Sequence, residues 1–173
     1  MKRFKHILCV VELGQPADTL LERAVSLTQN NQATLTVVSV IPRITAGIGM
    51  PDGGPISREL QEASIADSRQ QLEALLAPFR ARITIDSKVL MGTAFLEISR
   101  EVLRHDHDLL IKAPEDPDWL NRLFGSDDMH LLRKCPCPVW LVKSSPSKSY
   151  RCILAAVDVA LDHPADELEI SHK

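Results

Sequence analysis

The most reactive side chains in the sequence are two cysteines just before the last predicted strand. Cys135 and Cys137 are separated only by Pro136, and paired thiols can hold a metal ion or undergo oxidation. A structural zinc site needs further ligands, and no second cysteine pair lies at zinc spacing. We predict that both thiols are structural, at the turn into the strand, and that Cys9 in a core strand is an inert apolar residue.

Two histidines form the next candidate group. His105 and His107 flank Asp106 at a predicted helix end, where a cationic imidazole interacts favourably with the helix dipole. Metal binding would also need a carboxylate and a third ligand, and the sequence pattern does not place them there. We therefore expect ordinary surface histidines and no metal site.

Other chemistry-bearing patterns are weak. Trp119, beside a polar loop, could stack on a ligand base, but packing is the more common role of such a residue and of Trp140. The sequence contains no nucleophile elbow, P-loop or HExxH motif. We expect no catalytic residues.

Apolar strand-like runs alternate with helical patterns along the first 143 residues. Continuous apolar runs indicate strands buried on both faces, and helices between them predict βαβ units with right-handed crossovers. The expected strands are residues 6–11, 35–41, 83–90, 109–112 and 139–143, and the expected helices begin near Pro16, Ser57 and Gly92 and span 119–133. The predicted fold class is an open, doubly wound α/β domain with a parallel sheet.

The composition argues against a nucleic-acid-binding, membrane-spanning or exported protein. The 173 residues are 45% hydrophobic and 25% charged with a net charge of −3, which is typical of a globular domain without a basic footprint for nucleic acid. The longest apolar runs are too short to span a bilayer. The N-terminus lacks a signal-peptide pattern, so we expect a cytoplasmic protein with reduced thiols.

The end of the chain repeats its beginning. Residues 153–158 match residues 7–12, an apolar run that ends in an acid, and residues 164–168 match residues 16–20. We predict a complete domain over residues 1–143, a Ser-rich linker over 144–150, and the start of an incomplete second repeat over 151–173. The alternative is a chance similarity between two strand-turn-helix openings.

Three segments of the chain form a recognisable pattern. They are His107-Asp108-Leu109-Leu110-Ile111-Lys112, the pair Gly125-Ser126, and Leu131-Leu132-Arg133-Lys134-Cys135-Pro136-Cys137-Pro138-Val139. Together they resemble the universal stress protein family. The resemblance implies a five-stranded parallel sheet in the order 3-2-1-4-5 with helices on both faces. It also implies a homodimer, or a tandem pseudo-dimer in members that carry two such domains.

The resemblance places a nucleotide loop after the fourth strand, and this chain departs from its pattern. Nucleotide-binding members carry Gly-x2-Gly-x9-Gly-Ser/Thr after this strand. Here Ala113 and Asp116 replace the first two glycines, and eight residues rather than nine separate Asp116 from Gly125. Only the Gly125-Ser126 pair of the pattern remains. Prolines at 114 and 117 remove backbone donors, and the acids at 115, 116 and 118 would repel phosphate. At about 5 Å each such pair costs roughly 1–3 kcal/mol.

Two further residues complete the candidate binding set. Glu12 stands where the family usually has an aspartate that contacts the nucleoside, and Val40 lies near the carboxyl end of the second strand. Ligands of α/β sheets bind at the carboxyl ends of strands, which favours this position. The alternative for Glu12 is a solvated turn residue.

The sequence therefore predicts a non-catalytic stress-response or regulatory domain that does not hold ATP in the usual way. One alternative is a domain that binds ATP or another adenine nucleotide in a modified mode. Another is a weak ATPase or a thiol-dependent redox protein.

Overall fold

The structure is a computed structural model that describes residues 3–44, 54–114 and 127–143. The predicted linker at 144–150 and the predicted second repeat at 151–173 lie outside the described residues. The first part of the helix predicted over 119–133 lies outside them as well.

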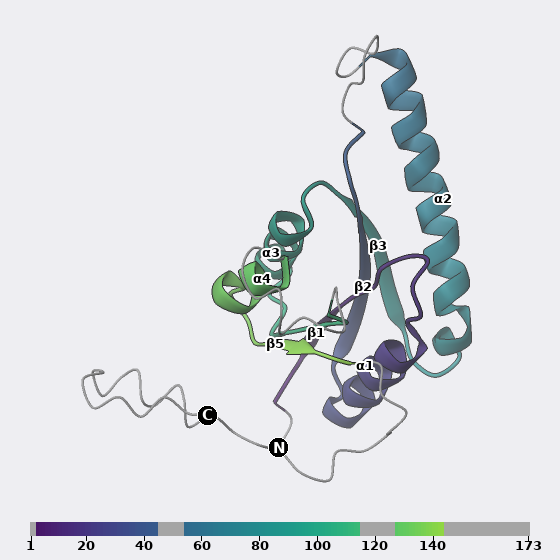
Figure 1. Ribbon diagram of the computed structural model, residues 1–173. Helices are drawn as coiled ribbons and strands as arrows, with labels where there is room; N and C mark the ends of the chain where they lie inside the picture. The colour runs from purple at the N-terminus through teal and green to yellow at the C-terminus, as the bar shows by residue number, and fades with distance from the viewer. Residues whose placement is uncertain (1–2, 45–53, 115–126, 144–173) are drawn as a thin grey trace, which may run out of the picture.

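Nine helices and strands alternate along the described residues (Figure 1). They are β1 (His6–Val10), α1 (Asp18–Asn31), β2 (Thr34–Ile41), α2 (Pro55–Arg80), β3 (Ile85–Met91), α3 (Ala94–Arg104), β4 (Leu109–Lys112), α4 (Asp127–Lys134) and β5 (Val139–Leu141). All neighbouring strands are parallel, and their order is β3-β2-β1-β4-β5. The predicted fold class and strand order are confirmed.

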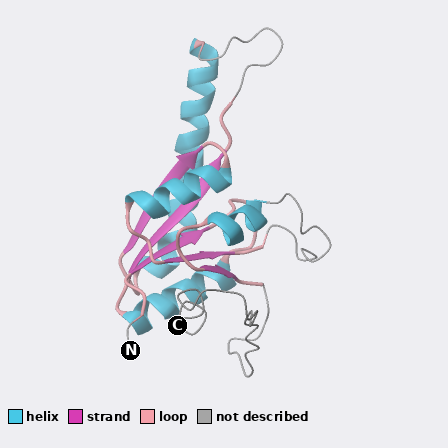
Figure 2. Cartoon of the chain, turned by 90° about the vertical axis from the view of Figure 1, so that its left-hand side faces the viewer, coloured by secondary structure: helices cyan, strands magenta, loops and turns pink. Residues whose placement is uncertain are grey.

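Helices cover both faces of the sheet, α1 and α2 on one side and α3 and α4 on the other (Figures 1 and 2). Successive side chains of β1 serve both layers, since Ile7 and Cys9 pack with α1 and α2 while Leu8 packs with α3 and α4. These side chains are fully buried, and burial of each large aliphatic residue contributes about 1.5–3 kcal/mol. β1 is therefore the central strand of the molecule.

The third strand begins two residues later than the sequence pattern predicts. The backbone N–H groups of Arg82 and Ile83 both donate to the carbonyl of Phe79, at 2.9 Å and 3.3 Å. Because these donors complete the end of α2, the segment cannot enter the sheet ladder, and pairing starts at Ile85 with Leu35. The apolar character of Ile83 instead contributes to packing against the core.

The Asp108 side chain joins the beginning of β4 to the beginning of β1. Its Oδ2 accepts a hydrogen bond from the Lys5 N–H at 2.6 Å, and its Oδ1 accepts one from the His6 N–H at 3.0 Å. The Asp108 N–H in turn donates to the His6 carbonyl at 2.9 Å. These bonds precede the first register pair, Ile7 with Leu109, and fix the alignment of the two strands.

We expect Asp108→Ala to lower the free energy of unfolding by about 1–3 kcal/mol, because two hydrogen bonds to a charged acceptor are lost. Asp108→Asn should be milder, since the amide oxygen can still accept one of them. Urea denaturation of both variants and the parent measures the difference. An unfolding free energy unchanged in Asp108→Ala would show that the two bonds do not hold the strands in register.

Candidate functional site

The strand order reverses between β1 and β4, and their carboxyl ends form the expected ligand position of such a sheet. Glu12 follows β1, Lys112 ends β4, and Ala113 comes directly after it. The helices that follow these two strands, α1 and α4, lie on opposite faces (Figure 1). The structure thus brings Glu12 and Ala113, two of the predicted binding residues, to one edge of the sheet. Their role in binding stays a prediction.

A buried ion pair occupies this edge. Lys112 is only 3% exposed, and its Nζ lies 2.7 Å from Asp128 Oδ1 on α4 and 3.5 Å from Glu12 Oε1. It also donates to the Ala113 carbonyl at 3.2 Å. One ammonium therefore faces two carboxylates, and these three groups together carry one negative charge.

Sequence reasoning missed Lys112 and Asp128 as members of the site. A signal for the first was present, because Lys112 ends an otherwise apolar run in which all residues are buried. A lysine in such a place needs a compensating carboxylate. Its partner lies 16 residues away along the chain, so spacing alone did not identify it.

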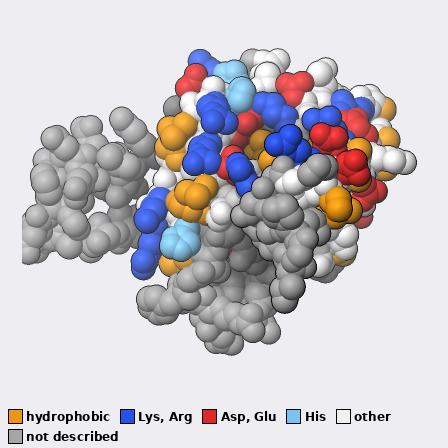
Figure 3. Space-filling model, turned by 90° about the horizontal axis from the view of Figure 1, so that it is seen from above, with side chains coloured by type: hydrophobic (Ala, Val, Ile, Leu, Met, Phe, Trp, Pro, Cys, Tyr) orange, Lys and Arg blue, Asp and Glu red, His pale blue; other side chains and the backbone are white. Residues whose placement is uncertain are grey.

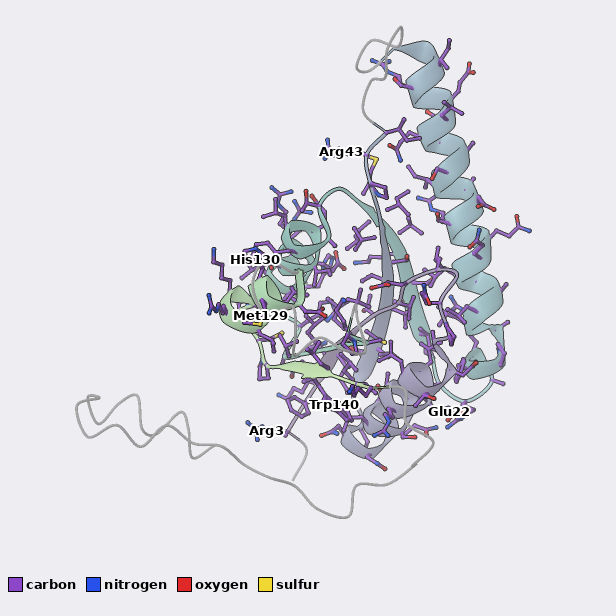
Figure 4. All side chains as sticks on the ribbon, in the orientation of Figure 1. Arg3, Glu22, Arg43, Met129, His130 and Trp140 are labelled. Atoms are coloured by element: carbon purple, nitrogen blue, oxygen red, sulfur yellow. The ribbon has the colours of Figure 1, made fainter. Side chains whose placement is uncertain are left out.

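The other predicted binding residues are not part of this ion pair. Val40 lines a pocket of about 690 Å³ with residues from the end of β2 and the start of α3, among them Arg43, Glu97 and Arg100. Figure 4 labels Arg43 at the end of β2. Within this pocket Arg100 Nη1 contacts Glu97 Oε1 at 2.5 Å. Asp116, Gly125 and Ser126 lie outside the described residues, and so does Trp119.

The two cysteines before β5 lie close together, with 3.7 Å between their Sγ atoms. The hydrogen bond from the Cys137 thiol lowers the pKa of Cys135 to about 7, while the same contact raises the pKa of Cys137. Both pack against the core layer under α3 and α4. Their structural role stays a prediction. Cys9 is fully buried, and burial raises its pKa to about 12.

The prediction that both histidines after α3 are ordinary surface residues is wrong for His107, which is only 7% exposed. Asp106 adopts a left-handed conformation (φ 51°), so the chain turns back at the helix end. This turn places His107 beside Glu101, a carboxylate that the sequence pattern did not assign to the group. Burial lowers the pKa of His107, and the nearby Glu101 opposes that shift.

Three further observations concern the surface charge, Trp140 and the helices. On the face seen from above, basic and acidic side chains lie beside one another (Figure 3). Trp140, labelled in Figure 4, lies in β5 and packs against the core layer under α1 and α2. No helix among the described residues is long and apolar enough to cross a membrane.

Removal of one member of the Lys112–Asp128 pair should destabilise the fold strongly. We expect Lys112→Met or Asp128→Leu alone to lower the unfolding free energy by about 3–5 kcal/mol, because a buried charge loses its main compensation. The double variant should lose much less than the sum of the two. Thermal and urea unfolding of the four proteins gives the coupling energy, and additive losses would contradict the pairing.

Comparison with known proteins shows which sequences and folds the chain is similar to. The chain is 31% identical over 166 residues to universal stress protein E of Photorhabdus laumondii, which covers 92% of this chain and 52% of that protein. The chain thus spans about half the length of the curated relatives it matches first.

Solved structures show the same fold. The universal stress protein UspA from Lactobacillus plantarum superposes with a TM-score of 0.66 at 22% identity, over 81% of this chain and 98% of that one. A universal stress protein in complex with cAMP superposes with a TM-score of 0.53 at 15% identity, over 82% and 98%. The model of the universal stress protein family matches residues 3–143. The chain belongs to the universal stress protein family.

Proposed function

We propose that this chain is a non-catalytic, regulatory universal stress protein domain that does not hold ATP in the family's usual mode. The observation that carries the proposal is the buried ion pair of Lys112 with Asp128, which the half-exposed Glu12 approaches to 3.5 Å at the carboxyl ends of β1 and β4. The charged groups at the expected ligand position thus interact with one another rather than with a ligand.

Charge disfavours a phosphate at this edge. The only ammonium of the ion-pair group already faces two carboxylates, and the sequence continues with acids at 115, 116 and 118. A phosphate about 5 Å from one such carboxylate is repelled by roughly 1–3 kcal/mol. Lys112 already donates to Asp128 and to the Ala113 carbonyl, so it has little capacity left for a phosphate. Giving up the buried pair with Asp128 would cost about 3–5 kcal/mol.

An adenine nucleotide bound in a modified mode is the second candidate. The cAMP complex of a protein with this fold favours it, although 15% identity relates the two by fold alone. Glu12 and the pair Gly125-Ser126 would then supply the contacts. Weak ATPase activity would require the same site. Thiol-dependent redox chemistry would instead use Cys135, the thiol of lowered pKa.

We also propose that the domain works paired with another of its kind. The relatives matched first are about twice as long as the matched part, which favours a tandem pseudo-dimer. A homodimer of this chain is the alternative. Sedimentation measurements on the chain by itself separate a monomer from a dimer.

Isothermal titration calorimetry should find no ATP binding tighter than about 1 mM for the unmodified chain. The double change Glu115→Ser with Asp116→Gly removes two repulsive charges and restores one glycine, so affinity should rise about tenfold or more. The matched control Glu62→Ser with Asp67→Asn removes two charges from the exposed face of α2 and should have no such effect.

Micromolar affinity of the unmodified chain would overturn the proposal in favour of the modified nucleotide mode. An equal gain in the control variant would show that overall charge, rather than the loop, limits binding.

A further inference from the structure

Three potential metal ligands converge where α3 ends. Glu101, His105 and His107 each offer a ligand atom, and these atoms all lie within 4.8 Å of one another. His105 Nδ1 is 3.2 Å and His107 Nε2 is 4.0 Å from the same oxygen, Glu101 Oε1. Carboxylate oxygen and imidazole nitrogen together form a ligand set typical of zinc and related divalent ions.

The backbone builds this cluster from one short turn. The His105 N–H donates to the Glu101 carbonyl at 3.2 Å, and the His107 N–H reaches back to the Val102 carbonyl at 3.1 Å. Across the left-handed Asp106, the bond from His107 to Val102 is the six-to-one bond found in Schellman helix ends. The partial negative charge of a helix C-terminus also favours a cation at this place.

His107 is the feature that points to a ligand. Its side chain is 4% exposed, yet neither ring nitrogen has a hydrogen-bond partner within the described part of the chain. A buried polar group without a partner costs about 1–3 kcal/mol. Burial lowers the pKa of His107, which favours the neutral imidazole that binds metals. A cation between His107 and Glu101 would satisfy one of the two ring nitrogens, Nε2.

We propose that Glu101, His105 and His107 form a binding site for a divalent transition-metal ion, best suited to zinc. Ligand atoms held about 2.1 Å from a tetrahedral ion lie roughly 3.4 Å apart. The distances of 3.2 Å and 4.0 Å approach this value, and a small rotation of His105, whose side chain is 46% exposed, adjusts the third. The exposed side leaves the fourth position to water.

Lys88 on β3 competes with the metal for the carboxylate. Its Nζ lies 2.6 Å from Glu101 Oε1 and 3.2 Å from His105 Nε2. The ammonium thus supplies the positive charge of the metal-free form, and a metal ion would displace it. The Lys88 side chain is 37% exposed, so it can turn into solvent when the ion enters.

Calorimetric titration of the chelator-treated full chain with zinc tests the site. We expect one ion per chain, with His105→Ala and Glu101→Gln each weakening binding at least tenfold. Lys88→Gln should tighten binding, because it removes the competing ammonium. Asp106→Asn is the matched control for Glu101→Gln: it removes a negative charge from the same turn without removing a ligand, and its affinity should stay within threefold of the parent.

Two further measurements test whether His107 is a ligand and whether zinc binds at the cysteines instead. Zinc should shift the imidazole NMR signals of both His105 and His107 in the parent chain, which avoids substitution of the buried ring. The Cys135→Ser, Cys137→Ser variant should bind zinc as the parent does. No zinc binding by the parent, unchanged affinity in His105→Ala, or loss of binding in the serine variant would each overturn the proposal.

Discussion

A lysine ammonium buried in a protein requires a carboxylate within hydrogen-bonding distance, and this requirement organises one end of the molecule. Lys112 ends β4, and Asp128 near the start of α4 lies 2.7 Å from its Nζ. Because α4 is the last helix before β5, the ion pair links that helix to the end of β4. The contact with Glu12 extends the same network to the central strand β1. The same three charged groups therefore connect β1, β4 and α4 at the edge where a ligand would be expected.

A second lysine meets the same requirement in a different way. Lys88 on the edge strand β3 contacts Glu101, which is 4% exposed, but the ammonium itself reaches the surface. Lys112 and Asp128 are both buried, so replacement of the lysine ammonium by another cation would expose buried charge. The Lys88 pair is open on one side, and two imidazoles stand next to it. The difference in enclosure is the physical reason to expect ligand exchange at the end of α3 rather than at the end of β4.

The sequence predicted the architecture well because apolar runs report burial directly. The continuous run of β1 predicted a strand covered on both faces, and the structure shows that its side chains alternate between two helix layers. The start of β3 was predicted too early, because the donors of Arg82 and Ile83 go to the end of α2. Glu12 and Ala113 were placed at one edge, since carboxyl ends of neighbouring parallel strands meet there.

Polar partners were harder to predict, because they depend on three-dimensional contacts between distant residues. Asp128 is identified as the partner of Lys112 only by the packing of α4 on the sheet in the structure. His107 was assigned to the surface because a left-handed residue at Asp106 cannot be read from an Asp between two histidines. Backbone geometry at that one residue decides whether the imidazole faces solvent or Glu101.

The most direct test of the account is an NMR titration of the isotope-labelled full chain with ATP, followed at the backbone amides of Glu12, Ala113 and Asp128. If the ion pair satisfies the ligand position internally, these signals should stay in place up to about 1 mM ATP. Saturable shifts of these three amides at micromolar ATP would contradict it, because they would show a nucleotide at the carboxyl ends of β1 and β4.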